Sequence, residues 1–217
     1  MTELFDCSDP GQRTAGIASA ISALKGGRLV VLPTDTVYGI GADAFDGTAV
    51  AALLAAKGRG RDMPVPVLVG SWHTIDGLVY SVPDAARELI QAFWPGALSL
   101  VVRQAPSLQW DLGDAYGTVM LRMPLHPIAI ELLREVGPMA VSSANISGRP
   151  AAVTAADARE QLADLVEVYL EGGTSVQQAA STIVDLTGAQ PKVLRQGPVT
   201  AAAIADVLGV EAETLTA

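Results

Sequence analysis

Apolar runs typical of buried strands alternate with stretches of helical periodicity along the whole chain. The runs predict strands over residues 28–32, 66–69, 98–103, 118–123, 138–141, 166–170, 181–186 and 193–195. Capping residues, helical spacing and Gly or Pro stops predict helices over residues 9–25, 48–57, 83–94, 127–136, 154–165 and 200–208. This alternation indicates a layered α/β fold, with a loop expected over residues 104–117.

The chain is predicted to form one domain, because no repeat, low-complexity tract or long linker divides it. Residues 14–208 are expected to form the domain itself. Residues 1–13 are interpreted as a polar tail and the start of the first helix, and residues 209–217 as a polar tail that frays.

Short oxygen-bearing side chains follow the first apolar run. Pro33 ends the predicted strand because it has no N–H to donate, and Thr34, Asp35 and Thr36 come next. Polar residues at the carboxyl end of a buried strand occupy the usual ligand position of open α/β sheets. A plain turn explains the same residues, since Thr and Asp favour turns through local hydrogen bonds.

Positive charges are scarce, and several stand at informative positions. Lys57, Arg59 and Arg61 end an apolar helix, where the helix dipole explains one cation better than three. Arg122 lies inside an apolar strand, and Arg195 lies at a strand end. A buried Arg needs a partner, which is either one of the protein's own carboxylates or a ligand.

The strand around Arg122 places two polar groups on one face. Thr118 and Arg122 share that face and lie about 13 Å apart by strand rise. Residues 142–148 form a second turn-like stretch, Ser-Ser-Ala-Asn-Ile-Ser-Gly, whose successive N–H groups can cradle an anion. Together with the isolated cations, these groups suit a nucleoside triphosphate and a small zwitterion, with hydroxyls available to a magnesium ion.

Other chemistries receive little support. His73 and His126 have no Cys or His at metal-ligand spacing, and neither a P-loop nor a G-x-S-x-G elbow occurs. The single Cys7 cannot form an internal disulfide, so cytoplasmic residence is expected. No apolar run is long enough to span a bilayer. A net charge of −9 argues against broad nucleic-acid binding.

Five ordered motifs carry a resemblance to a known family. They are Pro33-Thr-Asp-Thr-Val-Tyr-Gly39, Lys57-x-Arg59, Ser143-Ala-Asn-x-Ser-Gly148, Ser181-Thr-Ile-Val-Asp185 and Arg195-x-Gly197. The chain resembles the YrdC family of threonylcarbamoyl-AMP synthases over residues 14–208. The resemblance implies a twisted, mostly mixed sheet flanked by helices, with a concave, basic cleft.

The resemblance also implies a reaction. L-threonine, bicarbonate and ATP, which is used with Mg²⁺, would give threonylcarbamoyl-AMP and pyrophosphate. A separate transferase complex would then modify an adenosine of tRNA, and a weak contact between this chain and tRNA fits that role. Catalysis of this kind needs positioning and charge stabilisation rather than a Cys or His nucleophile.

The family's site residues carry over by position. Lys57 and Arg59 are the expected catalytic pair facing the phosphates, and Thr36 and Arg122 would bind threonine, the latter through its carboxylate. The nucleotide would meet Lys57, Arg59, Thr118, Ser143, Asn145 and Arg195. No protein-held metal site is expected.

Departures from the family pattern occur at four positions. Many relatives have Pro, Asn and His where Gly60, Met63 and Leu68 stand, and Ser where Ala151 stands. A side-chain role at these positions is therefore not expected.

Two alternatives stay open. An RNA-binding or ribosome-maturation factor is disfavoured by the acidic balance and by an aromatic content of 5%. A carbamoyl-adenylate enzyme with another acceptor would share the same site.

Overall fold

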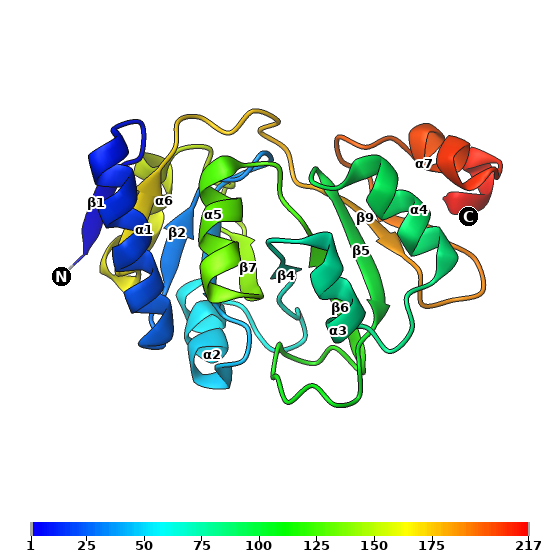
Figure 1. Ribbon diagram of the computed structural model, residues 1–217, viewed down its shortest axis with the longest axis horizontal. Coiled ribbons are helices and arrows are strands. Elements are labelled where there is room, and N and C mark those ends of the chain that lie inside the picture. The colour runs from blue at the N-terminus through cyan, green and yellow to red at the C-terminus, as the bar shows by residue number, and fades with distance from the viewer. Residues whose placement is uncertain (1, 217) are drawn as a thin grey trace.

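A single mixed sheet runs through the molecule in the computed structural model, which describes residues 2–216 (Figure 1). Its strand order is β1-β8-β2-β3-β7-β4-β6-β5-β9-β10, with both parallel and antiparallel neighbours. The strands are β1 (Glu3–Asp6), β2 (Val30–Leu32), β3 (Gly39–Asp43), β4 (Val67–Leu68), β5 (Leu98–Arg103), β6 (Thr118–Arg122), β7 (Met139–Ser143), β8 (Val168–Glu171), β9 (Thr182–Asp185) and β10 (Lys192–Arg195). The predicted α/β class and mixed sheet are confirmed.

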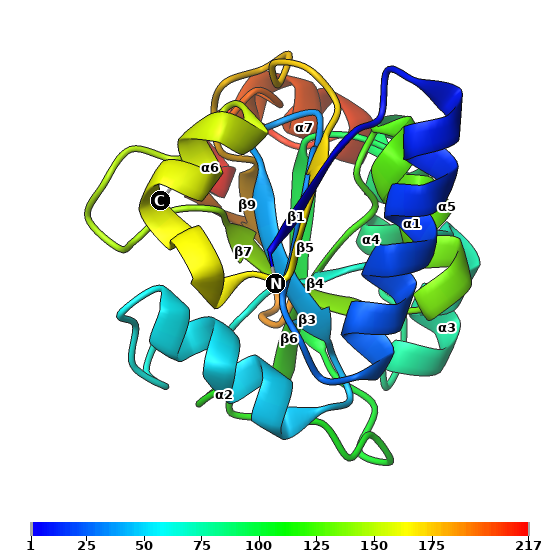
Figure 2. The ribbon, with the colours of Figure 1, turned by 90° about the vertical axis from the view of Figure 1, so that its left-hand side faces the viewer.

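Helices cover both faces of this sheet. Figure 2 shows α1, α5, α3 and α4 on one side and α2 and α6 on the other. The helices are α1 (Pro10–Lys25), α2 (Gly47–Ala56), α3 (Ile75–Leu78), α4 (Asp84–Phe93), α5 (Pro127–Val136), α6 (Ala155–Leu162) and α7 (Ala201–Leu208). Among the described residues, no helix combines the length and apolar character needed to cross a membrane.

The helix starts follow the capping chemistry of the sequence. The Asp9 carboxylate accepts a hydrogen bond from the Gln12 N–H at the start of α1. Thr154 and Asp157 form a reciprocal capping box at the start of α6, as predicted. That helix ends at Leu162, and a 3-10 turn continues to Leu165.

The strand β3 was not predicted, because two glycines interrupt its apolar pattern. A Cβ on Gly39 would lie 2.5 Å from Val141 Cγ1, and one on Gly41 would lie 2.6 Å from Met139 Cε. Glycine in a strand interior often marks such a close approach. The glycines therefore allow β7 side chains to pack across β3, although they weaken the strand signal in the sequence.

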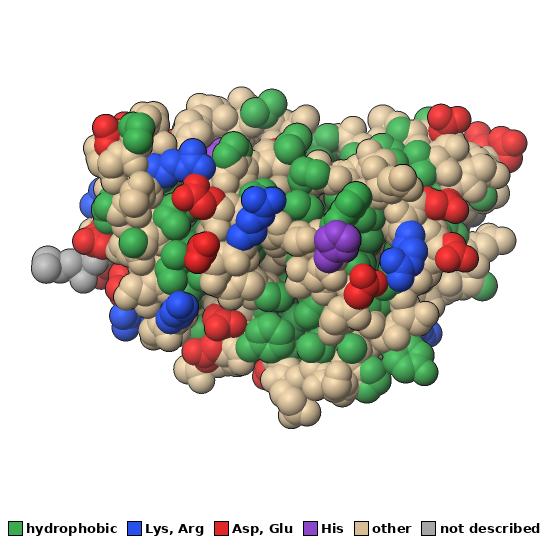
Figure 3. Space-filling model, viewed as in Figure 1, with side chains coloured by type: hydrophobic (Ala, Val, Ile, Leu, Met, Phe, Trp, Pro, Cys, Tyr) green, Lys and Arg blue, Asp and Glu red, His purple; other side chains and the backbone are tan. Residues whose placement is uncertain are grey.

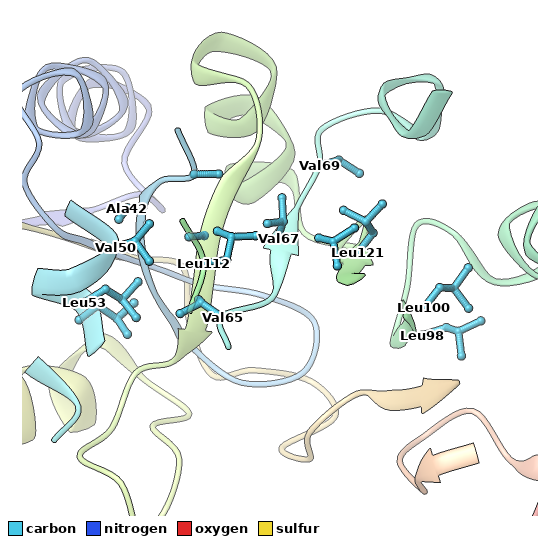
Figure 4. Close-up of a cluster of buried hydrophobic side chains, with 14 of the residues drawn as sticks. Ala42, Val50, Leu53, Val65, Val67, Val69, Leu98, Leu100, Leu112 and Leu121 are labelled. Carbon is cyan, nitrogen blue, oxygen red and sulfur yellow. The ribbon is translucent and has the colours of Figure 1, made fainter. Parts of the chain in front are cut away.

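The hydrophobic core joins helices and strands that are distant in sequence. Figure 4 shows Val50 and Leu53 of α2 near Val65, Val67 and Leu112. Leu112 is 3% exposed although it belongs to the segment 104–117, which has no regular strand or helix. This long loop is therefore anchored in the core.

Both chain ends are more ordered than predicted. Residues 3–6 form β1, which pairs in parallel with β8, so four residues of the expected N-terminal tail belong to the sheet. Cys7 is buried, and this burial raises the pKa of its thiol to about 11. At the other end, a 3-10 turn over Ala212–Leu215 buries Leu215. The sequence did not predict this turn, because polar residues flank Leu215.

Candidate active site

A hollow of about 450 Å³ lies over the central strands of the sheet. Segments far apart in sequence line it: the β2–β3 turn, the segment after α2, β6, the end of β7, the start of β9 and Arg195 of β10. Hydroxyl groups of Thr34, Thr36, Ser99 and Ser181 accompany several cationic side chains here. The hollow thus brings together most of the polar groups that the sequence singled out.

The partner of Arg122 is Asp35. Arg122 Nη2 lies 2.5 Å from Asp35 Oδ1, and the two side chains are 8% and 9% exposed. Arg122 Nη1 donates to Thr36 Oγ1 at 2.8 Å, and Nε donates to the Gly96 carbonyl at 2.8 Å. Of the two partners that the sequence left open, the protein's own carboxylate is therefore present.

Arg122 nevertheless lines the hollow. One N–H on each terminal nitrogen has no hydrogen-bond partner among the described residues, since a guanidinium carries five donors. We expected the whole guanidinium of Arg122 to be available for a bidentate contact with a ligand. Instead, three of its five N–H groups donate to the protein, and two remain for a ligand.

The hydroxyls of Thr34 and Thr36 have defined directions. Thr34 Oγ1 donates its only hydrogen to the Val37 carbonyl at 2.6 Å. The 3.0 Å contact between the two hydroxyl oxygens must then have Thr36 as donor. Because Thr36 Oγ1 also accepts from Arg122, it retains only acceptor capacity. A ligand atom that meets Thr36 must be an N–H or O–H donor.

Lys57 does not reach the hollow as expected. Its side chain is fully buried, and Nζ donates to the carbonyl oxygens of Ser143 and Asn145, the latter at 2.8 Å. The Lys57 carbonyl in turn accepts from the Ser147 N–H at 2.9 Å. Lys57 therefore ties the end of α2 to the turn after β7, and its described contacts are structural rather than phosphate-facing.

Lys57 also makes stability depend on pH. Burial, and then the nearby Arg59 charge, lowers its pKa from 10.5 to about 8. Above that pH the folded protein has lost a proton that the unfolded chain holds to about pH 10. We expect the free energy of unfolding of the native protein, relative to Lys57→Met, to rise between about pH 8 and 10. Urea denaturation of both proteins across this range measures it, and a constant difference would contradict the expectation.

Arg59 is the cation with the clearest capacity for a ligand. It lines the hollow, and its Nη1 makes one long contact of 3.5 Å with Ser142 Oγ. Its Nε is buried and has no hydrogen-bond partner among the described residues. Because Nε is closed to solvent, the terminal nitrogens are the donors that Arg59 can offer to an anionic oxygen, and Nη2 has no hydrogen-bond partner among the described residues.

The turn after β7 divides the predicted residues into two groups. Ser142 and Ser143 line the hollow. Asn145 instead donates from Nδ2 to the Ile146 and Arg149 carbonyls at 2.9 and 2.8 Å, and it is outside the lining. The amide therefore shapes the turn, whereas the two serines form part of the hollow's wall.

Arg195 reaches the hollow from the edge strand β10. Its Nε and Nη2 donate to the Ser181 carbonyl at 3.0 and 2.8 Å. Ser181 Oγ lies 2.8 Å from Ser99 Oγ, which links β9 to β5. Burial lowers the pKa of the Arg195 guanidinium. These contacts hold the charge over the site and leave Nη1 without a hydrogen-bond partner among the described residues.

Gly197 explains the final motif. A Cβ there would lie 2.4 Å from the Ala180 carbonyl oxygen and 2.5 Å from the Thr182 nitrogen, both backbone atoms. We expect Gly197→Ala to destabilise the fold by about 1–3 kcal/mol through overpacking. Gly188→Ala is the matched control, because its Cβ would lie 3.8 Å from the nearest atom. Equal denaturation midpoints for the two variants would contradict this reading.

Thr118 lies outside the site. Its hydroxyl donates to the Ala115 carbonyl at 2.7 Å, and only Met120 and Arg122 of β6 line the hollow. The predicted alternation of faces is correct, but the hollow ends before it reaches Thr118. The expected contact with the nucleotide therefore has no support here.

Several lining residues were not among the predicted site residues. Ser142 directly precedes one recognised motif, and Ser181 opens another. Asp35 is outside the lining but pairs with Arg122, and its signal in the sequence was the need of Arg122 for a partner. Asp62 is the one carboxylate of the hollow's lining among the described residues. Of the four departures, Met63 and Leu68 line the hollow with apolar surface, whereas Gly60 and Ala151 do not.

The charge of the hollow is mixed. Three arginines and Asp62 line it, so the expectation of a basic cleft stays a prediction. On the face shown in Figure 3, Lys or Arg and Asp or Glu side chains are interspersed over α1 and α5. A larger hollow of about 670 Å³ lies elsewhere, between α2 and the segment after α6, and it contains Arg28 paired with Glu167. It lacks the hydroxyl-rich turns.

Sequence comparison places the chain among characterised relatives. The family model Sua5_yciO_yrdC, described as "Telomere recombination", matches residues 22–197. A Mycobacterium tuberculosis protein, provisionally named a threonylcarbamoyl-AMP synthase, is 77% identical over 215 residues, 99% of both chains. The Vibrio cholerae threonylcarbamoyl-AMP synthase is 34% identical over 83% of this chain and 97% of its own.

Structural comparison agrees. The crystal structure of Pyrococcus abyssi Sua5 complexed with L-threonine superposes with a TM-score of 0.86 at 36% identity. The match covers 89% of this chain and 57% of that one. Escherichia coli YciO, at 23% identity and a TM-score of 0.79 over 91% of this chain and 97% of its own, shares the fold.

Proposed function

The chain belongs to the Sua5/YciO/YrdC family, and we propose that it is a threonylcarbamoyl-AMP synthase. Its substrates would be L-threonine, bicarbonate and ATP, and its products threonylcarbamoyl-AMP and pyrophosphate. The observation that carries this proposal is the convergence of Arg59, Arg122 and Arg195 with two hydroxyl-rich turns in one hollow. The relatives' names, and the threonine complex of the P. abyssi protein, support the same reaction.

Threonine is assigned to the β2–β3 turn. Thr36 can only accept, which suits the ammonium or hydroxyl group of the amino acid. The two remaining N–H groups of Arg122 suit its carboxylate. Asp35 keeps the Arg122 charge compensated when no substrate is bound. The pair thus presents a donor and an acceptor for the two charged groups of a zwitterion.

The phosphates are assigned to the opposite polar groups. The terminal nitrogens of Arg59, Arg195 Nη1 and the Ser142 and Ser143 hydroxyls are the donors assigned to them. Mg²⁺ is expected to arrive with ATP, since this ion usually binds one or two carboxylates together with substrate phosphates. Asp62 and the serine hydroxyls fit such a donor set, and the described residues contain no cluster of three metal-ligating side chains.

The chemistry follows from this placement. The threonine amine attacks the carbon of bicarbonate, and water leaves to give a carbamate. A carbamate oxygen then attacks the α-phosphorus of ATP, and the bond to the pyrophosphate oxygen breaks. The described side chains supply orientation and positive charge where negative charge develops. The reaction needs no protein nucleophile.

The product would pass to a separate threonylcarbamoyl-transferase complex that modifies tRNA, so we expect the protein to act in the cytoplasm. An RNA-binding role receives less support, because charges of both signs alternate on the face in Figure 3. A carbamoyl-adenylate enzyme with another acceptor would differ in the amino acid that it binds.

Calorimetry tests the threonine assignment directly. We expect saturable binding of L-threonine in the presence of ATP, bicarbonate and Mg²⁺, and much weaker binding of L-valine, which lacks the hydroxyl. Absence of threonine binding under all of these conditions would contradict the proposal.

A further inference from the structure

We propose that Arg61 is a positioning residue that clamps residues 58–64 from outside the hollow and so fixes the Arg59 side chain within it. This inference rests on the proposed function. Arg61 itself is not in the hollow's lining, whereas Arg59, Asp62, Met63 and Pro64 on either side of it are. Its effect on the reaction would therefore pass through the segment that carries those four residues.

Contacts with α2 hold only the first residues of the segment. The Gly58 and Arg59 N–H groups donate to carbonyls of Ala55 and Leu54 in α2, each at 2.9 Å. Beyond them, the Met63 N–H makes a long internal contact of 3.4 Å with the Gly60 carbonyl. Gly58 has φ +61, a left-handed conformation that glycine adopts at little cost. The middle of the segment consequently depends on contacts with other parts of the chain.

Arg61 supplies those contacts. Its Nη1 and Nη2 donate to the two carboxylate oxygens of Asp111 at 2.9 and 2.8 Å, a bidentate pair, and Nε lies 3.3 Å from Asp114 Oδ1. The Asp114 N–H donates to the Arg61 carbonyl at 2.8 Å. Gly113 has φ +99, and a Cβ there would lie 2.8 Å from that carbonyl oxygen. The two segments are thus joined by both side chain and backbone.

The segment that receives the clamp is itself rigidly placed. Leu112 is buried in the core, and its carbonyl accepts from the Val65 N–H at 2.8 Å. Trp110 stacks on Phe45 with ring centroids 5.5 Å apart, and its Nε1 donates to Gln104 Oε1 at 2.9 Å. The long loop 104–117 therefore acts as a brace between the core and the Arg59 segment.

Gly60 explains why the segment needs this brace. Glycine leaves the backbone more conformational freedom than any other residue does. Arg61 follows that glycine directly, so the external clamp restricts the freedom of the segment. This accounts for a third cation in a cluster whose other members are buried or face the hollow.

Activity and stability should respond differently to loss of the clamp. The Arg61 and Asp111 side chains are 55% and 52% exposed, and exposed pairs contribute little to stability. We expect Arg61→Ala to shift Tm by at most about 2–4 °C. We expect kcat/KM for ATP to fall by about tenfold or more, because misplacing a catalytic group by about 1 Å can cost 10²-fold.

A double-mutant cycle tests the clamp. Arg61→Ala, Asp111→Asn and the double variant are compared by pyrophosphate release, with amide hydrogen exchange of residues 58–64 as a second readout. The Asn at 111 can still accept from the Gly113 N–H, so the turn is preserved. Arg87→Ala is the matched control, since Arg87 and Asp76 form an ion pair whose side chains are 59% and 54% exposed and lie outside the hollow's lining.

The expected result is a double variant no more impaired than Arg61→Ala alone, with faster exchange of residues 58–64 and an unaffected Arg87→Ala. If the fold-losses of kcat/KM in the two single variants multiply in the double variant, the two residues act independently and the clamp is overturned. A native kcat/KM in Arg61→Ala would overturn it as well. A native protein that releases no pyrophosphate would instead refute the proposed function, and hydrogen exchange would then test the clamp alone.

Discussion

Arg59→Ala is expected to lower kcat/KM for pyrophosphate release by about 10²–10³-fold, by analogy with loss of a preorganised oxyanion donor. Among the described residues, the only hydrogen bond of the Arg59 side chain is the 3.5 Å approach of Nη1 to Ser142 Oγ. Removing the side chain therefore breaks few interactions within the fold, whereas it removes a cation from the proposed phosphate site. Steady-state kinetics and thermal denaturation separate the two effects.

Two variants make this measurement interpretable. Arg59→Lys keeps a charge but loses the planar fork, so its activity should fall between native and Arg59→Ala. Arg103→Ala removes an exposed arginine from β5 outside the hollow's lining and should retain native kinetics. Near-native turnover in Arg59→Ala would exclude it from the phosphate site.

Arg122→Met is expected to destabilise the fold by about 3–5 kcal/mol, since breaking a buried ion pair leaves an uncompensated charge. The Asp35 side chain, which is only 9% exposed, would lose its guanidinium partner. Its carboxylate would keep one hydrogen bond, from the Leu125 N–H at 2.9 Å. The Thr36 hydroxyl would also lose the donor that orients it. Urea denaturation at neutral pH measures the change.

The companion variant Asp35→Leu/Arg122→Met removes both charges and should recover part of that stability, because apolar replacement of a buried pair is often neutral. It should not recover threonine binding. A loss below about 1 kcal/mol in Arg122→Met would show that the pair is not the buried anchor described above.

Local patterns predicted most of the fold. The apolar runs and capping residues identified α1, α5 and β5 to within a residue or two. They missed β3, where packing against Val141 and Met139 selects glycine, and β1, whose pairing with β8 depends on residues more than 160 positions away. Signals that arise only in tertiary contact are absent from a local window.

The candidate site shows the same limit. Residue type and motif identified Thr36, Arg59, Arg122, Ser143 and Arg195, all of which line the hollow. The same reasoning placed Lys57 and Asn145 against the ligand, although both side chains donate to backbone carbonyls of the turn after β7. A motif indicates that a residue matters to the site. Only the hydrogen bonds in the structure show whether its side chain stabilises the surrounding turns or is available to a ligand.

We propose that ATP, L-threonine and bicarbonate react together in one hollow. The most direct measurement is pyrophosphate release by the native protein with Mg²⁺, repeated with each of the three substrates omitted and with L-serine or L-valine in place of threonine. The account predicts release only when all three are present, together with formation of threonylcarbamoyl-AMP. Release that is independent of threonine or of bicarbonate would contradict it.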